Sequence, residues 1–280
     1  MLHLIAEMFT YPFMVRALCM GVLVALCAAV LGVTLVLKRY SMIGDGLSHV
    51  GFGALAIATA MNAAPLAVAI PVVIVAAFLL LRLTENSKIK GDAAIALIST
   101  GSLAVGVMVV SMTTGMNTDV YNYLFGSILS MSQEDVVLTG VVSAAIMILF
   151  VFFYHRIFAV TFDETFARAT GLNARLYNMV IALLTALVIV VGMRMMGSLL
   201  ISSLVVFPAV TSMRTCTTFR SVMIASAIVS AVCLVAGLII SYLYAAPTGA
   251  SIVLCNIAAF IAFAAVQKGR ECLQSDRKSI

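Results

Sequence analysis

Asp45 and His49 are the two residues of this 280-residue sequence whose types and spacing are best suited to chemistry. They lie four residues apart at the start of an apolar run, and a helix places residues at this spacing on one face. A carboxylate and an imidazole on adjacent turns offer one oxygen and one nitrogen to a metal ion such as zinc or manganese. Because ionisable groups in an apolar helix are costly, they usually serve a substrate or ion pathway.

The number of ligands indicates that this pair is incomplete. One helix supplies two ligands, whereas a closed zinc site needs four. Two copies of the helix that meet across a twofold axis would supply two Asp and two His. A second interpretation stays open, in which Asp45 only complements the dipole of a helix capped by Ser41, with His49 as its hydrogen-bonded neighbour.

The composition predicts the class of protein that must position these residues. Of the residues, 64% are hydrophobic and only 10% are charged, which is typical of an integral membrane protein. The apolar runs reach about 20 residues without strand-like alternation, so we expect an all-α, polytopic transmembrane bundle. Despite a net charge of +5, we expect no nucleic-acid partner, because the basic residues lie in short loops.

Nine candidate spans follow from the apolar runs, and we expect them to form a single transmembrane domain over residues 1–280. Lys38 and Arg39 end the first span and mark a cytoplasmic loop. The run at about 197–213 contains Pro208, so it either crosses the membrane or is partly broken. The chain is therefore predicted to have eight to nine spans. The spans are predicted at about 17–37, 43–61, 66–82, 93–113, 136–154, 176–192, 197–213, 221–244 and 250–267.

A second candidate site is the charged segment at about 162–172, predicted on the cytoplasmic side. Asp163 and Glu164 begin a short helix, Ala167 leaves room on it, and Gly171 can end it. A short exposed helix between two spans can dock in a groove of a partner protein. The alternative is an amphipathic connector that lies on the membrane surface.

Three acids, Asp119, Glu134 and Asp135, fall on the predicted outer side. They can attract a cation or a cationic partner, or they can belong to a solvated loop. The sequence contains no GxxxxGK[ST] phosphate loop and no HExxH motif. We therefore expect that the chain does not hydrolyse ATP by itself and is not a metalloprotease.

Five blocks of the sequence, in order, resemble one family: the membrane permease subunits of bacterial ATP-binding-cassette importers for zinc, manganese and sometimes iron. The resemblance covers almost the whole chain. The blocks are YPFMVRAL (11–18), KRYSMIGDGLSHV (38–50), FDETFARATGL (162–172), GSLLISSLVVFPAVTSMR (197–214) and PTGASIVL (247–254).

This resemblance implies a multi-pass homodimer in the bacterial plasma membrane, among lipids, with separate cytoplasmic ATPase subunits and an extracellular metal-binding lipoprotein or periplasmic protein. It places Asp45 and His49 on the metal pathway. It also makes the segment with Asp163, Glu164, Ala167 and Gly171 a coupling helix that docks on the ATPase. It implies a transporter rather than an enzyme, with transported Zn²⁺ or Mn²⁺ and no permanently bound cofactor.

The expected function is thus uptake of a divalent transition metal. One Asp and one His per chain suit zinc slightly better than manganese, which tolerates more oxygen ligands. The alternative is a secondary metal transporter driven by an ion gradient, which needs further acids well inside the spans. Cys255, in the last block, is a soft ligand type, and we expect it to serve packing.

Overall fold

The computed structural model describes residues 10–86, 91–113, 126 and 133–278. All regular secondary structure in this part of the chain is helical, because a helix satisfies its own backbone hydrogen bonds inside a membrane. In chain order the helices are α2 (Pro12–Leu37), α3 (Ser41–Ala60), α4 (Pro65–Asn86), α5 (Gly91–Thr113), α7 (Gln133–Phe152), α8 (Tyr154–Phe162), α9 (Glu164–Ala169), α10 (Ala174–Met196), α11 (Ser198–Met213), α12 (Phe219–Tyr244) and α13 (Thr248–Lys278).

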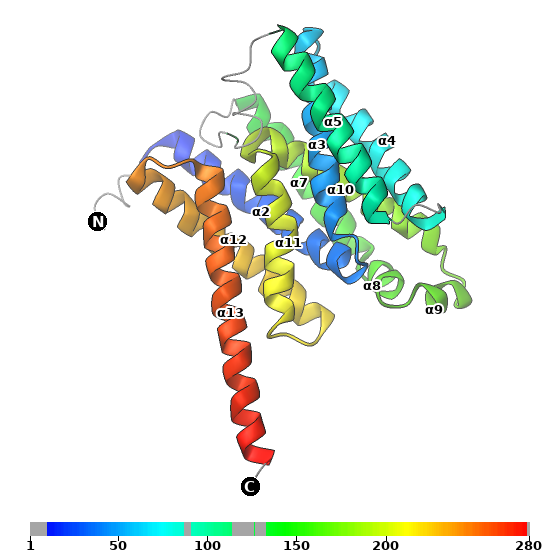
Figure 1. Cartoon of the computed structure of the whole chain (residues 1–280), viewed down its shortest axis with the longest axis vertical. Coiled ribbons are helices and arrows are strands. Elements are labelled where there is room, and N and C mark those ends of the chain that lie inside the picture. Colours follow the sequence, from blue (N-terminus) through cyan, green and yellow to red (C-terminus); the bar gives the residue numbers. More distant parts are fainter. Residues whose placement is uncertain (1–9, 87–90, 114–125, 127–132, 279–280) are drawn as a thin grey trace.

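Two long helices, α2 and α10, lie at the centre of the bundle. In their most apolar windows 67% and 72% of the residues are buried, against 22% in each of α5 and α13. α2 packs against α11 and α12, whereas α10 packs against α4 and α11. Figure 1 shows α3, α4 and α5 on one side of the molecule and α12 and α13 on the other. The outer helices therefore present most of their surface to lipid or to another chain.

The predicted number of spans is not confirmed. The described residues contain six helices long and apolar enough to cross a membrane, or seven if one bent pair counts as a single span. α3, predicted as a span at 43–61, is not among the six because its polar residues and glycines lower its hydropathy. Asp119, predicted on the outer side, lies outside the described residues.

Two predicted spans differ in shape from the expectation. The run at 136–154 ends at Phe152, and α7 meets α8 at a bend of 68°. The run at 197–213 forms α11, which has 16 residues, or about 24 Å at 1.5 Å per residue, and is shorter than a hydrocarbon core of about 30 Å. Pro208 lies inside α11 without ending it. The break between α10 and α11 is at Gly197, which has φ +82°.

The predicted helix at 162–172 is shorter than expected. Phe162 is the last residue of α8, Asp163 separates the two helices, and α9 itself has six residues, Glu164–Ala169. Ser41 is also not a cap as predicted, because Tyr40 occupies the N-cap position of α3 and makes no side-chain cap bond.

Candidate metal-transport site

Asp45 and His49 lie on one face of α3, as their spacing predicts. His49 Nε2 is 3.7 Å from Asp45 Oδ2, and the side chains are 20% and 46% exposed respectively. The neighbours of Asp45 in sequence show where this face points. Gly44 faces Val205 of α11 and Gly46 faces Ile95 of α5. Asp45 therefore projects between α5 and α11, toward the outside of this single chain.

The imidazole of His49 has one nitrogen that its own chain does not satisfy. Nδ1 is buried and has no hydrogen-bond partner, although a buried polar atom normally has one. No group of three or more His, Cys, Asp or Glu side chains that could hold a metal ion occurs within the described ranges. The pair on α3 thus supplies two ligands, and the structure of one chain leaves the set incomplete.

Close contacts at two glycines hold α3 in this position. A Cβ at Gly53 would lie 2.8 Å from the backbone oxygen of Ser102 in α5. A Cβ at Gly51 would lie 2.6 Å from the flexible end of Met193 in α10. Small residues allow helices in a membrane to approach this closely. The glycines of α3 therefore set the distance between the ligand pair and the neighbouring helices.

A polar contact beside the pair was not predicted from the sequence. Ser202 of α11 donates to Ser48 Oγ at 3.3 Å, and Ser48 donates to the backbone oxygen of Asp45 at 2.7 Å. This contact links α11 to the turn of α3 that carries the ligands. The only available sequence signal was a serine pair, Ser202 and Ser203, inside an apolar run.

The second candidate site, around α9, has well-defined ends. Asp163 is the N-cap and accepts a hydrogen bond from the backbone N–H of Phe166 at 2.9 Å. Ala167 is fully buried and anchors the helix against the bundle. Gly171 follows with φ +85°, a conformation that side chains rarely adopt. Phe166, which is 65% exposed, gives α9 an apolar outer surface that a partner protein can cover.

Cys255 belongs to no metal-binding cluster within the described part of the chain. Cys255 is half-buried in α13, and its backbone oxygen accepts a hydrogen bond from Cys233 Sγ at 3.6 Å. Glu134 and Asp135 belong to α7, but their side chains lie outside the part of the structure that is described.

A family model described as the ABC 3 transport family matches residues 10–267. The chain belongs to this family. Its members are ATP-binding-cassette permeases, so the chain is a multi-pass membrane permease, as its sequence predicted, and a transporter rather than a catalyst.

Relatives with named cargoes span three metals. The high-affinity zinc uptake system membrane protein ZnuB of Haemophilus influenzae is 27% identical over 90% of this chain and 96% of its own length. The manganese transport system membrane protein MntC of Listeria monocytogenes is 29% identical over 90% of each chain. A probable iron transport system membrane protein of Haemophilus influenzae is 33% identical over 90% of this chain and 89% of its own.

A solved structure of PsaBC from Streptococcus pneumoniae in complex with Fab contains a chain of the same fold. The TM-score is 0.84 at 29% identity, and the match covers 93% of this chain and 94% of that chain. The arrangement of helices around α2 and α10 is thus shared with an experimentally determined relative.

Proposed function

We propose that this chain is the membrane-spanning subunit of an importer that takes up a divalent transition metal, with zinc as the first cargo and manganese as the next. The observation that carries the proposal is the incomplete ligand pair, Asp45 and His49, on the outward face of α3. The side chains of His49 and Asp45 are 20% and 46% exposed, so an ion or a second copy can reach them from outside this chain.

A second copy of the chain completes the site in this proposal. Two α3 helices that face one another across a twofold axis bring together two carboxylates and two imidazoles, the ligand number of a tetrahedral zinc site. These groups replace part of the hydration shell of the ion. Binding has to be firm enough to select the metal and weak enough to release it.

Two further partners follow from the same proposal. A separate pair of cytoplasmic ATPase subunits docks on α9, where Phe166 offers an exposed apolar contact. An extracellular metal-binding protein delivers the ion to the outer side. Family membership disfavours the alternative, a transporter driven by an ion gradient.

Uptake by the reconstituted complex tests the site. The chain is reconstituted with its ATPase and binding protein in vesicles, and ATP-dependent accumulation of ⁶⁵Zn²⁺ is measured. Asp45→Ala and His49→Ala are each expected to abolish uptake while the complex stays assembled on gel filtration. Asp92→Asn, which removes an exposed carboxylate from the start of α5, is the matched control and keeps uptake. Uptake at the unmodified rate in either α3 variant contradicts the assignment.

Competition between metals tests the cargo. Unlabelled Zn²⁺ is expected to suppress ⁶⁵Zn²⁺ uptake at the lowest concentration, with Mn²⁺ next and Mg²⁺ inactive, because imidazole ligands suit zinc and carboxylate-rich sites suit manganese. If Mn²⁺ competes better than Zn²⁺, the order of the two cargoes is reversed while the site assignment stands.

A further inference from the structure

A buried lysine at the end of α2 joins three helices. Lys38 Nζ donates a hydrogen bond to Asn178 Oδ1 of α10 at 2.5 Å and lies 3.5 Å from Glu164 Oε2 of α9. Asn178 Nδ2 donates to the same carboxylate oxygen at 3.2 Å. These three side chains, which we name the Lys38 clasp, form a closed triangle. Only 8% of the Lys38 side chain is exposed, so the lysine is not an ordinary loop residue.

Glu164 of the clasp is ionised at neutral pH. Burial opposes ionisation of Glu164, but hydrogen bonds from Asn178 and Arg168 and the charges of Lys38 and Arg168 outweigh it. The pKa of this carboxyl is therefore lowered from its ordinary 4.5. Charge-assisted hydrogen bonds of this kind are stronger than neutral ones and depend closely on geometry. A displacement of Glu164 therefore acts on Lys38.

Lys38 is close in the chain to the ligand pair. It is the C-cap residue of α2, Arg39 follows with φ +62°, and α3 begins at Ser41. Asp45 is the fifth residue of α3, about 6 Å along the helix axis from Ser41. A tight turn of three residues thus connects the clasp to the helix that carries Asp45 and His49.

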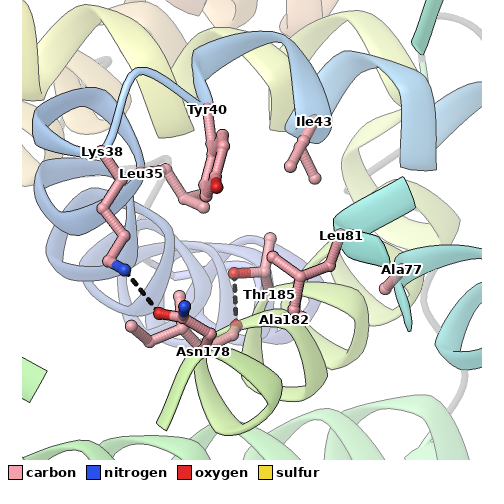
Figure 2. A pocket seen from close by; sticks show the side chains of 10 residues that line it. Leu35, Lys38, Tyr40, Ile43, Ala77, Leu81, Asn178, Ala182 and Thr185 are labelled. Carbon is pink, nitrogen blue, oxygen red and sulfur yellow. Dashed lines mark hydrogen bonds between the residues drawn. The ribbon is translucent and has the colours of Figure 1, made fainter. Parts of the chain in front are cut away.

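The turn is not fully packed against the helices beneath it. A cavity of about 10 Å³, close to the smallest that holds one water molecule, lies beside the clasp. Figure 2 shows Lys38, Tyr40 and Ile43 on one side of it, opposite Asn178 and Thr185 of α10. The polar contacts of the clasp therefore add to the apolar packing of Tyr40 and Ile43, which also holds the turn against the helices beneath it.

At its other end the clasp reaches the proposed docking helix. Glu164 is the first residue of α9, and it faces the bundle while Phe166 is exposed two residues later. α9 therefore has one surface available to a partner and another tied to the turn before α3.

We propose that Lys38 is a positioning residue that transmits movement of α9 to the start of α3, and so to the metal ligands. This inference rests on the proposed function. When the ATPase moves α9, Glu164 moves Lys38, and the turn tilts the ligand-bearing end of α3. Asn178, which is 2% exposed in α10, is the fixed point against which this movement occurs.

The number of metal ions moved per ATP hydrolysed tests this role. In the reconstituted full complex, Lys38→Met is expected to lower that ratio at least about fivefold, the lower end of measured coupling between sites. ATP hydrolysis is expected to continue. Glu164 keeps Arg168 and Asn178 as partners in this variant, so no carboxylate is left unpaired. A folding defect reduces both rates together and leaves the ratio unchanged.

Two further variants separate the clasp from general charge effects. Arg39→Gln removes the adjacent positive charge, which is exposed and outside the clasp, and is expected to keep the unmodified ratio. The double variant Lys38→Glu with Glu164→Lys reverses the pair, and Asn178 can serve it by rotating its amide. We expect this double variant to move more metal ions per ATP hydrolysed than Lys38→Met, but fewer than the unmodified complex.

The outcomes distinguish this inference from the proposed function. If the unmodified complex moves no metal with ATP, the proposed function fails. If it does move metal, and Lys38→Met has the unmodified ratio, only the clasp is overturned. A loss of ATP hydrolysis and transport in equal proportion also overturns it, because the residue then serves folding or docking.

Discussion

Two helices of this protein carry an acid and a basic residue four positions apart, and their surroundings differ. In α9, Glu164 pairs with Arg168 at 2.5 Å and is also held by Lys38 and Asn178. In α3, Asp45 and His49 are 3.7 Å apart, and His49 Nδ1 has no partner. The same local spacing thus gives a structural pair where other helices complete it, and a candidate ligand set where they do not.

Substitutions that make each pair resemble the other should have the largest effect on uptake. His49→Arg converts the α3 pair into an ion pair like that of α9 and places a fixed positive charge on the proposed pathway. We expect a larger loss of ⁶⁵Zn²⁺ uptake than the about 10- to 100-fold typical of changes around a metal ligand. The reciprocal Arg168→His removes an exposed pair worth no more than about 0.5 kcal/mol and should retain most uptake. Retained uptake in His49→Arg, together with a large loss in Arg168→His, would contradict the distinction between a ligand pair in α3 and a structural pair in α9.

Gly171 tests whether the shape of the α9 segment matters. Its φ of +85° disfavours a β-branched side chain by about 1–3 kcal/mol, although a Cβ there would meet nothing within 4 Å. Gly171→Val is expected to weaken the stimulation of the partner ATPase. Gly171→Asn is the matched control, because asparagine tolerates this conformation. Equal ATPase rates in the two variants would show that docking does not depend on this turn.

Gly53 tests how α3, unlike α9, is held by close packing. Gly53→Ala places a Cβ 2.8 Å from the Ser102 backbone oxygen, and such overpacking costs about 1–3 kcal/mol. We expect a lower Tm in detergent. Gly101→Ala, which would meet nothing within 4 Å, gains helix propensity without a clash and is expected to keep or raise the Tm. A Tm that falls equally in both variants would argue against a close contact at Gly53.

The smallest predicted effect is the acid sensitivity of the clasp. Because the folded-state pKa of Glu164 is lowered from 4.5, its contribution to stability is present above pH 4.5. That contribution is lost as the pH falls through the lowered value. The Tm of the unmodified protein should therefore fall more than that of Glu164→Gln below pH 4.5. Parallel Tm curves for the two proteins would exclude this contribution.

The sequence predicts the helices and the shared face of Asp45 and His49 on α3 well, because both depend on local spacing. The predicted number of eight to nine spans is not confirmed, because six described helices, or seven with the bent pair, are long and apolar enough to cross a membrane. Local hydropathy also does not reveal the bend between α7 and α8 or the break at Gly197. From the sequence, Lys38 is interpreted only as a charged residue in a cytoplasmic loop, whereas its side chain is buried in the structure. Ser202 and Asn178 were missed because a polar residue in an apolar run does not reveal its partner.

The membrane class, the helical architecture and the common face of Asp45 and His49 can all be predicted from the amino-acid sequence. These follow from residue type and helical periodicity, which act over a few neighbouring positions. The outward direction of this face and the contact of Lys38 with Asn178, 140 positions away, depend instead on the packing of the whole bundle. Such contacts depend on how the helices pack, because the energy of a buried charge is set by the groups that the fold places around it.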